Sequence, residues 1–172
     1  VQRTGAFCNE VAMFSITLLC MGKLKEKFYT AAAEEYSKRL RAFADFRIVE
    51  LPEYRLPDDP NETQIAQGLA REAEAIRKAI PKGAWLCVLT PEGRLLSSEE
   101  LASALHSVKT GGKSAACFLI GSSFGIDPSI KAMADLKLSM SKMTFPHHLA
   151  RVMALEQLYR AESIQAGTKY HK

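Results

Sequence analysis

Residues 141–161, SKMTFPHHLARVMALEQLYRA, join the end of a strand-like segment to the start of a helical one without a spacer. Pro146 ends the first part, and His147 and His148 follow it directly. In α/β proteins, ligands bind where the carboxyl ends of strands meet the amino ends of helices, because backbone groups are left unpaired there. The junction therefore predicts a ligand site, and the segments around it indicate the kind of ligand.

Upstream of this junction, short apolar segments alternate with amphipathic ones. The apolar segments are bounded by turn residues and are typical of buried strands, whereas the segments between them repeat their apolar residues at helical spacing. Alternation of this kind predicts an α/β fold with a mostly parallel sheet flanked by helices. Strand-like segments lie at 14–21, 46–51, 85–89, 115–121 and 136–145, and helical segments at 25–44, 63–80, 97–108, 128–134 and 149–166.

Several of the predicted helices begin with capping patterns. The sequence S-x-x-E at 97–100 matches a capping box, in which each side chain binds the backbone N–H of the other residue. Asp127 and Pro128 suit the N-cap and the first position of a short helix. Either Asn61 or Thr63 suits the cap of the second helix. These patterns predict where the helices begin.

The composition is that of an ordinary globular protein. The 172 residues include 47% hydrophobic and 24% charged residues, with a formal net charge of +4. This mild basic excess permits an anionic partner without requiring one. We expect residues 13–172 to form a single domain. Residues 1–12 precede Met13 and have no clear pattern, so they are interpreted as an upstream extension or a remnant of cloning.

Neither secretion nor membrane insertion is expected, so we predict a cytoplasmic protein. Only Arg3 precedes the apolar residues 11–21, and no apolar run reaches the roughly 18 residues of a membrane span. The four cysteines form no CxxC pair and match no zinc spacing, which predicts neither a disulfide framework nor a metal site. Three of them lie in apolar segments and are expected to be buried thiols, namely Cys20, Cys87 and Cys117.

Two familiar nucleotide-binding motifs are excluded. The sequence GGKS at 111–114 resembles the end of a Walker loop, but Ser107 stands where that motif needs glycine. This segment also precedes a strand instead of following one, so it is interpreted as a connecting turn. No GxGxxG occurs, and a dinucleotide site would therefore lack its phosphate-binding loop.

Three segments follow predicted strands, and their sequences are suited to binding a ligand. They are LTPEG at 89–93, GSSFG at 121–125 and MSKMTFP at 140–146. Because the carboxyl ends of parallel strands share one edge of the sheet, these segments are predicted to converge on a single pocket. The glycines at 121 and 125 allow either a tight turn or a close approach to a ligand.

Several of these segments also resemble one known family, the ribosomal RNA large subunit methyltransferase H family of small SPOUT methyltransferases. The similarity runs from about residue 13 to residue 172 and is most specific at the SKMTFPH and YHK sequences. The segments that carry it are LLCMGKLKE, LTPEGRLLSSEEL, LIGSSFG, LSMSKMTFPHHLARV, EQLYRA and the terminal YHK.

The resemblance implies an α/β fold whose C-terminal part forms a deep trefoil knot, an exception to the rule against threaded chains. It implies a homodimer that binds S-adenosylmethionine and methylates N3 of a pseudouridine in helix 69 of 23S rRNA, on the assembled ribosome. Ser122 stands where family members often have a second glycine, and it either narrows the cofactor site or contacts the ligand. The implied cofactor-binding residues are Leu89, Gly121, Met140, Ser141, Lys142, Met143, Thr144 and Phe145.

The N3 atom of the pyrimidine carries a proton at neutral pH. The implied reaction therefore requires a group that removes this proton or stabilises the anion as it forms. Arg151, Tyr170 and His171 are the catalytic candidates. An arginine can stabilise a developing oxyanion, and His171 can accept the proton. The alternative for the tail, residues 170–172, is a frayed terminus without a catalytic role. For His147 and His148, a structural or dimer-contact role is favoured over direct chemistry. Arg160, Lys169 and Lys172 are the RNA-binding candidates.

A different class of function stays open at this point. A non-catalytic RNA-binding module of the same fold would bind RNA with a strong salt dependence and would not bind S-adenosylmethionine. Binding of this cofactor separates the two functions.

Overall fold

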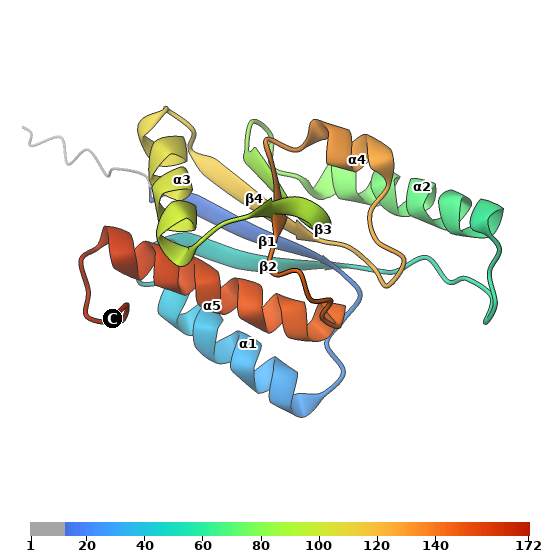
Figure 1. Ribbon diagram of the computed structural model, residues 1–172, viewed down its shortest axis with the longest axis horizontal. Helices are drawn as coiled ribbons and strands as arrows, with labels where there is room; N and C mark the ends of the chain where they lie inside the picture. The colour runs from blue at the N-terminus through green and yellow to red at the C-terminus, as the bar shows by residue number, and fades with distance from the viewer. Residues whose placement is uncertain (1–12) are drawn as a thin grey trace, which may run out of the picture.

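The core of the fold is a five-stranded sheet in which every strand pair is parallel (Figure 1). The computed structural model describes residues 13–172, so Cys8 and the extension predicted at residues 1–12 lie outside the described part. The strand order β2-β1-β4-β3-β5 confirms the predicted parallel arrangement. The strands are β1 (Ser15–Met21), β2 (Asp45–Leu51), β3 (Trp85–Leu95), β4 (Ala115–Ile120) and β5 (Leu136–Ser139).

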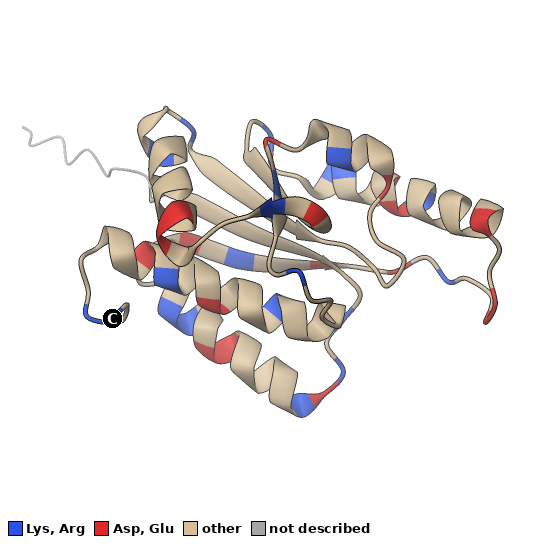
Figure 2. Ribbon diagram, viewed as in Figure 1, with Lys and Arg blue, Asp and Glu red and all other residues tan. Residues whose placement is uncertain are grey.

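Helices cover both faces of this sheet. On one face lie α1 (Lys27–Leu40), α3 (Ser98–Thr110) and α5 (His147–Gln165), and on the other lie α2 (Glu62–Ala79) and α4 (Pro128–Met133). A sheet covered on both faces needs strands that are apolar throughout, and the central strands SITLLCM and AACFLI meet this requirement. Figure 2 shows the charged residues mainly on the helices, the connecting loops and the edge strand β2.

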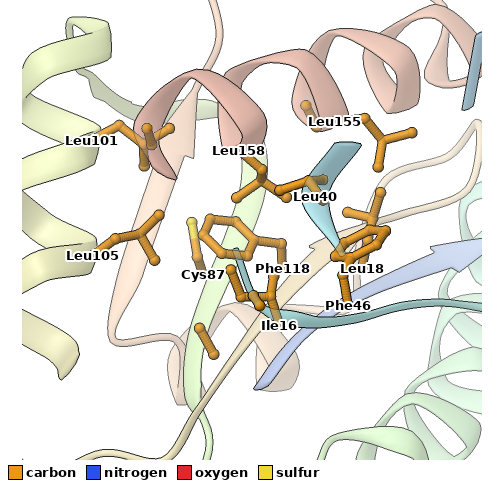
Figure 3. Close-up of a cluster of buried hydrophobic side chains, with 14 of the residues drawn as sticks. Ile16, Leu18, Leu40, Phe46, Cys87, Leu101, Leu105, Phe118, Leu155 and Leu158 are labelled. Atoms are coloured by element: carbon orange, nitrogen blue, oxygen red, sulfur yellow. The ribbon is translucent and has the colours of Figure 1, made fainter. Parts of the chain in front are cut away.

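Alternate residues of the strands enter two hydrophobic cores, one on each side of the sheet. Figure 3 shows the larger core, where Phe118 of β4 lies near Leu105 of α3 and Leu158 of α5. In the second core, Leu119 of β4 packs with Ile76 of α2 and Ile130 of α4. Both cores depend on the same strands, so the sheet joins all five helices to one body.

The described cysteines are buried thiols, as predicted. Cys20, Cys87 and Cys117 are each 0% exposed and form no disulfide. Burial raises the pKa of Cys20 and of Cys117 to about 12 and also raises that of Cys87, because a thiolate loses its hydration in the core. Within residues 13–172, no helix has both the length and the apolar character needed to cross a bilayer.

The predicted helix caps are confirmed. Ser97 forms the capping box with Glu100, and Asn61, not Thr63, caps α2. Asp127 caps α4, and Pro128 occupies its first position. Helix α5 begins at His147, directly after Pro146 and two residues before the predicted start at residue 149.

Two predicted strand ends were wrong. Residues 90–93 were expected to close the third strand with a turn, yet β3 continues to Leu95 with a register shift between Leu89 and Arg94 where it pairs with β5. The fifth strand was expected to reach residue 145 but ends at Ser139. Beyond that point serine side chains bind the backbone, with the Met143 N–H donating to Ser141 Oγ at 3.0 Å, and such local bonds compete with strand pairing.

The extended part of β3 crosses β5 at very short range. A Cβ atom added to Gly93 would lie 2.5 Å from the carbonyl carbon of Leu138 and 2.7 Å from its nitrogen. These are backbone atoms of a paired strand, so they cannot rotate away as a side chain can. The crossing therefore requires glycine at this position.

We predict that Gly93→Ala lowers the free energy of unfolding by roughly 3 kcal/mol, because the new methyl group overpacks against backbone. Urea denaturation followed by circular dichroism measures the effect. Gly68→Ala in α2 is the matched control, since a Cβ there would meet only side-chain atoms at 3.2 Å. Alanine also favours a helix over glycine, so this control should stay within about 1 kcal/mol of the parent. Equal losses in the two variants would contradict the prediction.

Candidate active site

Three segments meet at one edge of the sheet around a cavity of about 620 Å³, which we name the edge cavity. One is the part of β3 at its register shift, the other two follow β4 and β5, and the amino end of α5 completes the wall. The three segments expected to share one edge are therefore brought together. The volume lies within the range of small-molecule sites. The lining residues are Leu89, Thr90, Pro91, Ile120, Gly121, Ser122, Ser123, Gly125, Ile126, Lys131, Leu138, Ser139, Met140, Ser141, Met143, Thr144, Phe145, Pro146, His147 and Ala150.

Most of the residues predicted to bind a cofactor line this cavity. Leu89 comes from β3, Gly121 from the loop after β4, and the others from the loop after β5. Met143 is 73% exposed although it lines the cavity, so its side chain is available to a ligand. Lys142 is exposed and is not part of the lining. The cofactor role of these residues stays a prediction.

The glycines of the 121–125 loop make a tight turn. A Cβ atom on Gly121 would lie 2.4 Å from the carbonyl oxygen of Gly125, and Gly125 itself has a φ of +98°. The Gly125 N–H donates to the Ser122 carbonyl at 2.9 Å, which closes the turn. The close approach that requires glycine is therefore to the loop itself.

Ser122 is held by a residue that the sequence did not single out. Its hydroxyl donates to Oε2 of Glu72 at 2.9 Å, and Oε1 of Glu72 accepts from the Tyr54 N–H at 2.9 Å. Glu72 is only 6% exposed, and burial raises the pKa of its carboxyl. One carboxylate on α2 thus connects the loop after β2 to the loop after β4.

His147 lines the edge cavity, and both histidines contact carboxylates from other loops. His147 Nε2 lies 3.7 Å from Oε1 of Glu53, and His148 Nδ1 lies 3.3 Å from Oε2 of Glu26. The two imidazole rings are 4.2 Å apart. Burial and the neighbouring His148 lower the pKa of His147, so its neutral form is favoured. These contacts place the start of α5 beside the loops that follow β1 and β2.

Arg151 lies outside the edge cavity. Its side chain is 1% exposed, and Nη1 is 2.5 Å from Oε1 of Glu50. Its Nη2 donates to the carbonyl oxygens of Gly22 at 2.8 Å and Met21 at 3.3 Å. The guanidinium therefore ties α5 to the ends of β1 and β2, and the structure does not bring it to the other candidates.

The C-terminal tail packs on α5 and α3, away from the edge cavity of its own chain. The Tyr170 hydroxyl donates to Oε1 of Glu156 at 3.0 Å, and its ring lies 4.6 Å from that of Tyr159. Burial and hydrogen bonding raise the pKa of Tyr170 to about 12. None of the residues 169–172 lines the cavity, so the tail has ordered contacts but does not meet the cofactor-binding candidates.

Both nitrogens of the His171 ring have partners in this tail. Its Nε2 lies 2.8 Å from Oε1 of Glu99, and its Nδ1 lies 3.3 Å from Nη1 of Arg160. The guanidinium can only donate, so the matching tautomer carries its hydrogen on Nε2. Arg160 also pairs with Glu156. Within one chain, the proton-accepting nitrogen of His171 is therefore occupied.

Sequence reasoning also missed a charged pair at the register shift of β3. Lys131 lines the edge cavity, and its Nζ lies 2.5 Å from Oε1 of Glu92, while Oε2 of Glu92 accepts from the Thr90 hydroxyl. These hydrogen bonds lower the pKa of Glu92 to about 2. For Glu72, a signal was present in the sequence, because a glutamate on the apolar face of a helix needs a buried partner. Within residues 13–172, no group of three potential metal ligands comes together.

Solved structures agree with the fold described above. A probable methylase family protein from Haemophilus influenzae aligns with a TM-score of 0.50 and 15% identity, over 91% of this chain and 70% of that chain. A probable methyltransferase from Bordetella pertussis aligns with a TM-score of 0.51 and 13% identity, over 86% and 93%. At these identities the similarity supports the fold alone.

Sequence relatives are much closer. A protein of Moorella thermoacetica named ribosomal RNA large subunit methyltransferase H is 44% identical over 93% of this chain and 100% of its own length. A protein of the same name from Bifidobacterium adolescentis is 45% identical over 91% and 99%. The family model described as "Predicted SPOUT methyltransferase" matches residues 14–171. The chain therefore belongs to the SPOUT methyltransferase family.

Proposed function

We propose that this protein transfers a methyl group from S-adenosylmethionine to N3 of a pseudouridine in helix 69 of 23S rRNA, on the assembled ribosome. The observation that carries this proposal is the edge cavity, which is formed by the segments that resemble the family's cofactor-binding loops. Membership of the SPOUT family supports the methyl transfer, and the names of the relatives support an rRNA substrate.

The residues of the edge cavity fit S-adenosylmethionine. Leu89, Ile120 and Phe145 supply apolar walls for an adenine ring, and the backbone of residues 140–145 supplies donors and acceptors for its edge. Glycine at residue 121 allows the tight turn that forms the wall contributed by the 121–125 loop. When bound there, this cofactor supplies an electrophilic methyl group on a sulfonium ion. The protein's own task is to orient the pyrimidine and to manage the N3 proton.

Two sets of residues can help to remove the N3 proton during methyl transfer. Tyr170 and His171 bind Glu156 and Glu99 in their own chain, so their proposed roles require a second protomer whose edge cavity lies beside this tail. The homodimer implied by the family resemblance provides one. Within a single chain, His147 is the histidine that lines the cavity, and its lowered pKa leaves it neutral and able to accept a proton.

The remaining candidates are proposed to act on binding and architecture. Arg160, Lys169 and Lys172 are proposed to contact RNA phosphates, in keeping with the net charge of +4. Arg151 is proposed to orient α5, since its two Nη nitrogens bind Glu50, Gly22 and Met21. We also propose that residues 13–172 form one domain and that its C-terminal part is knotted. The close crossing of Gly93 over Leu138 supports the knot.

We predict that the protein methylates assembled ribosomes and transfers far less to free 23S rRNA. Labelled S-adenosylmethionine, followed by mapping of the labelled base, measures both the transfer and its position. Calorimetry with the cofactor tests the competing function. If the protein binds RNA but not S-adenosylmethionine, it is a non-catalytic RNA-binding module of the same fold.

We predict that deletion of residues 170–172 abolishes methyl transfer and leaves cofactor binding measurable. The reason is that these residues lie outside the edge cavity of their own chain and are proposed to act in the partner's. Transfer assays and calorimetry on the same preparation separate the two effects. A truncated protein with full activity would exclude a catalytic role for Tyr170 and His171.

The bond between Ser122 and Glu72 is predicted to position the 121–125 loop for the cofactor. Ser122→Ala removes a hydrogen bond to a charged group and should weaken S-adenosylmethionine binding about 10-fold. Glu72→Ala should do the same, and the double variant should be no weaker than Glu72→Ala, because both substitutions remove one contact. Calorimetry gives the dissociation constants. The control is Glu74→Ala, which changes an exposed glutamate of the same helix. If the losses of cofactor affinity in the two single variants add up fully in the double variant, the Ser122–Glu72 bond does not position the loop.

A further inference from the structure

We propose that a second cavity, across the 121–125 loop from the edge cavity, binds an unpaired nucleobase of the RNA substrate by stacking against Tyr54 and Phe124. This proposal rests on the RNA methyl transfer proposed above and adds a place where the RNA is held. We name this second site the α2 cavity. Its volume is about 270 Å³, and its lining residues are Glu53, Tyr54, Arg55, Leu56, Pro57, Gly68, Leu69, Glu72, Ser122, Ser123 and Phe124.

The α2 cavity adjoins the place where the methyl donor is proposed to bind. Ser122 and Ser123 line both cavities, so a single loop separates them. An enzyme that modifies a base must take it out of its stack, and the nucleotides beside that base then lie unpaired next to the protein. A base held in the α2 cavity would be one of these neighbours.

Exposed aromatic side chains are concentrated at this cavity. Tyr54 is 49% exposed and Phe124 is 47% exposed, and they come from the loops after β2 and after β4. Among residues 13–172, the other aromatic residue exposed to this degree is Phe28, which lies on α1 and lines neither cavity. Large apolar side chains are left open to solvent at a cost, and aromatic rings at a binding surface offer stacking platforms for bases.

The ring of Tyr54 packs against α2. Gly68 lies inside α2, where glycine disfavours the helix, and a Cβ there would lie 3.2 Å from Cδ1 of Tyr54. Glycine therefore leaves room for the ring against the helix. The Tyr54 N–H donates to Glu72 at 2.9 Å, and the same carboxylate binds Ser122 in the loop that carries Phe124. Glu72 thus holds both the backbone of Tyr54 and the loop that carries Phe124.

One charged side chain at the cavity, Arg55, suits the phosphate group of a nucleotide. Arg55 is exposed, and within residues 13–172 no carboxylate lies within 4.0 Å of its guanidinium. Both oxygens of Glu72 already accept hydrogen bonds, and Oε1 of Glu53 lies near His147 at 3.7 Å. Glu53 and Glu72 line the cavity as carboxyl groups, so Arg55 is the lining side chain that can bind a phosphate or stack on a base.

The test compares Tyr54→Ala and Phe124→Ala with the parent protein in binding to ribosomes, measured as a dissociation constant without methyl transfer. Each substitution should weaken binding roughly 10-fold, since base stacking on an aromatic ring has effects of that size. Tyr54→Phe keeps the ring and should restore the parent affinity. Phe28→Ala is the control, because it removes a ring that is more exposed than either of these, lies elsewhere on the protein and should change nothing.

Two further measurements separate this proposal from its alternatives. Calorimetry should give the same S-adenosylmethionine affinity for all four variants, which shows that the edge cavity is intact. Ribosome binding does not depend on turnover. If the protein shows no methyl transfer, the proposed function is wrong, but the binding measurements still test the α2 cavity. Unchanged ribosome binding in both alanine variants overturns the site. A shift from dimer to monomer in light scattering would also overturn it, because the rings would then form a protein interface.

Discussion

The closeness of two backbones, at Gly93 and Leu138, is the constraint on which the rest of the structure depends. A single added carbon at residue 93 would lie 2.5 Å from the Leu138 carbonyl carbon. Because β3 can extend over β5 here, the chain leaves β5 directly beneath that extension and turns into α5 beside the loop after β4. The edge cavity exists because the last loop is held in this place.

Buried polar groups organise the loops that the apolar core cannot reach. Glu72 accepts one hydrogen bond from each of two loops, and Arg151 binds the ends of two strands. A buried charge without partners is costly, so each of these side chains holds its surroundings in one arrangement. The two hydrophobic cores give the sheet its stability, whereas these two residues determine how the loops at its edge are placed. The architecture and the site are therefore stabilised by different kinds of interaction.

Much of the fold could be predicted from local sequence patterns. The strand and helix order, the caps at Ser97 and Asp127, and the meeting of three strand ends all follow from periodicity and from the geometry of parallel sheets. The end of β5 could not be predicted, because the alternation in 136–145 continues past the last residue that has a partner strand. Glu72 and the position of the tail depend on contacts between residues far apart in the sequence. A local pattern can show that a carboxyl group such as Glu72 needs a buried partner, but it does not identify that partner or the surface on which the tail packs.

The three buried cysteines have a practical consequence for the chemistry of this protein. With the pKa of Cys20 and Cys117 near 12 and that of Cys87 also raised, almost no thiolate is present at neutral pH in the core. Alkylating and oxidising reagents attack the thiolate, so these sulfurs are inert while the fold is closed. A new cysteine placed on an outer loop of residues 13–172 would therefore accept a spectroscopic label in preference to these three thiols.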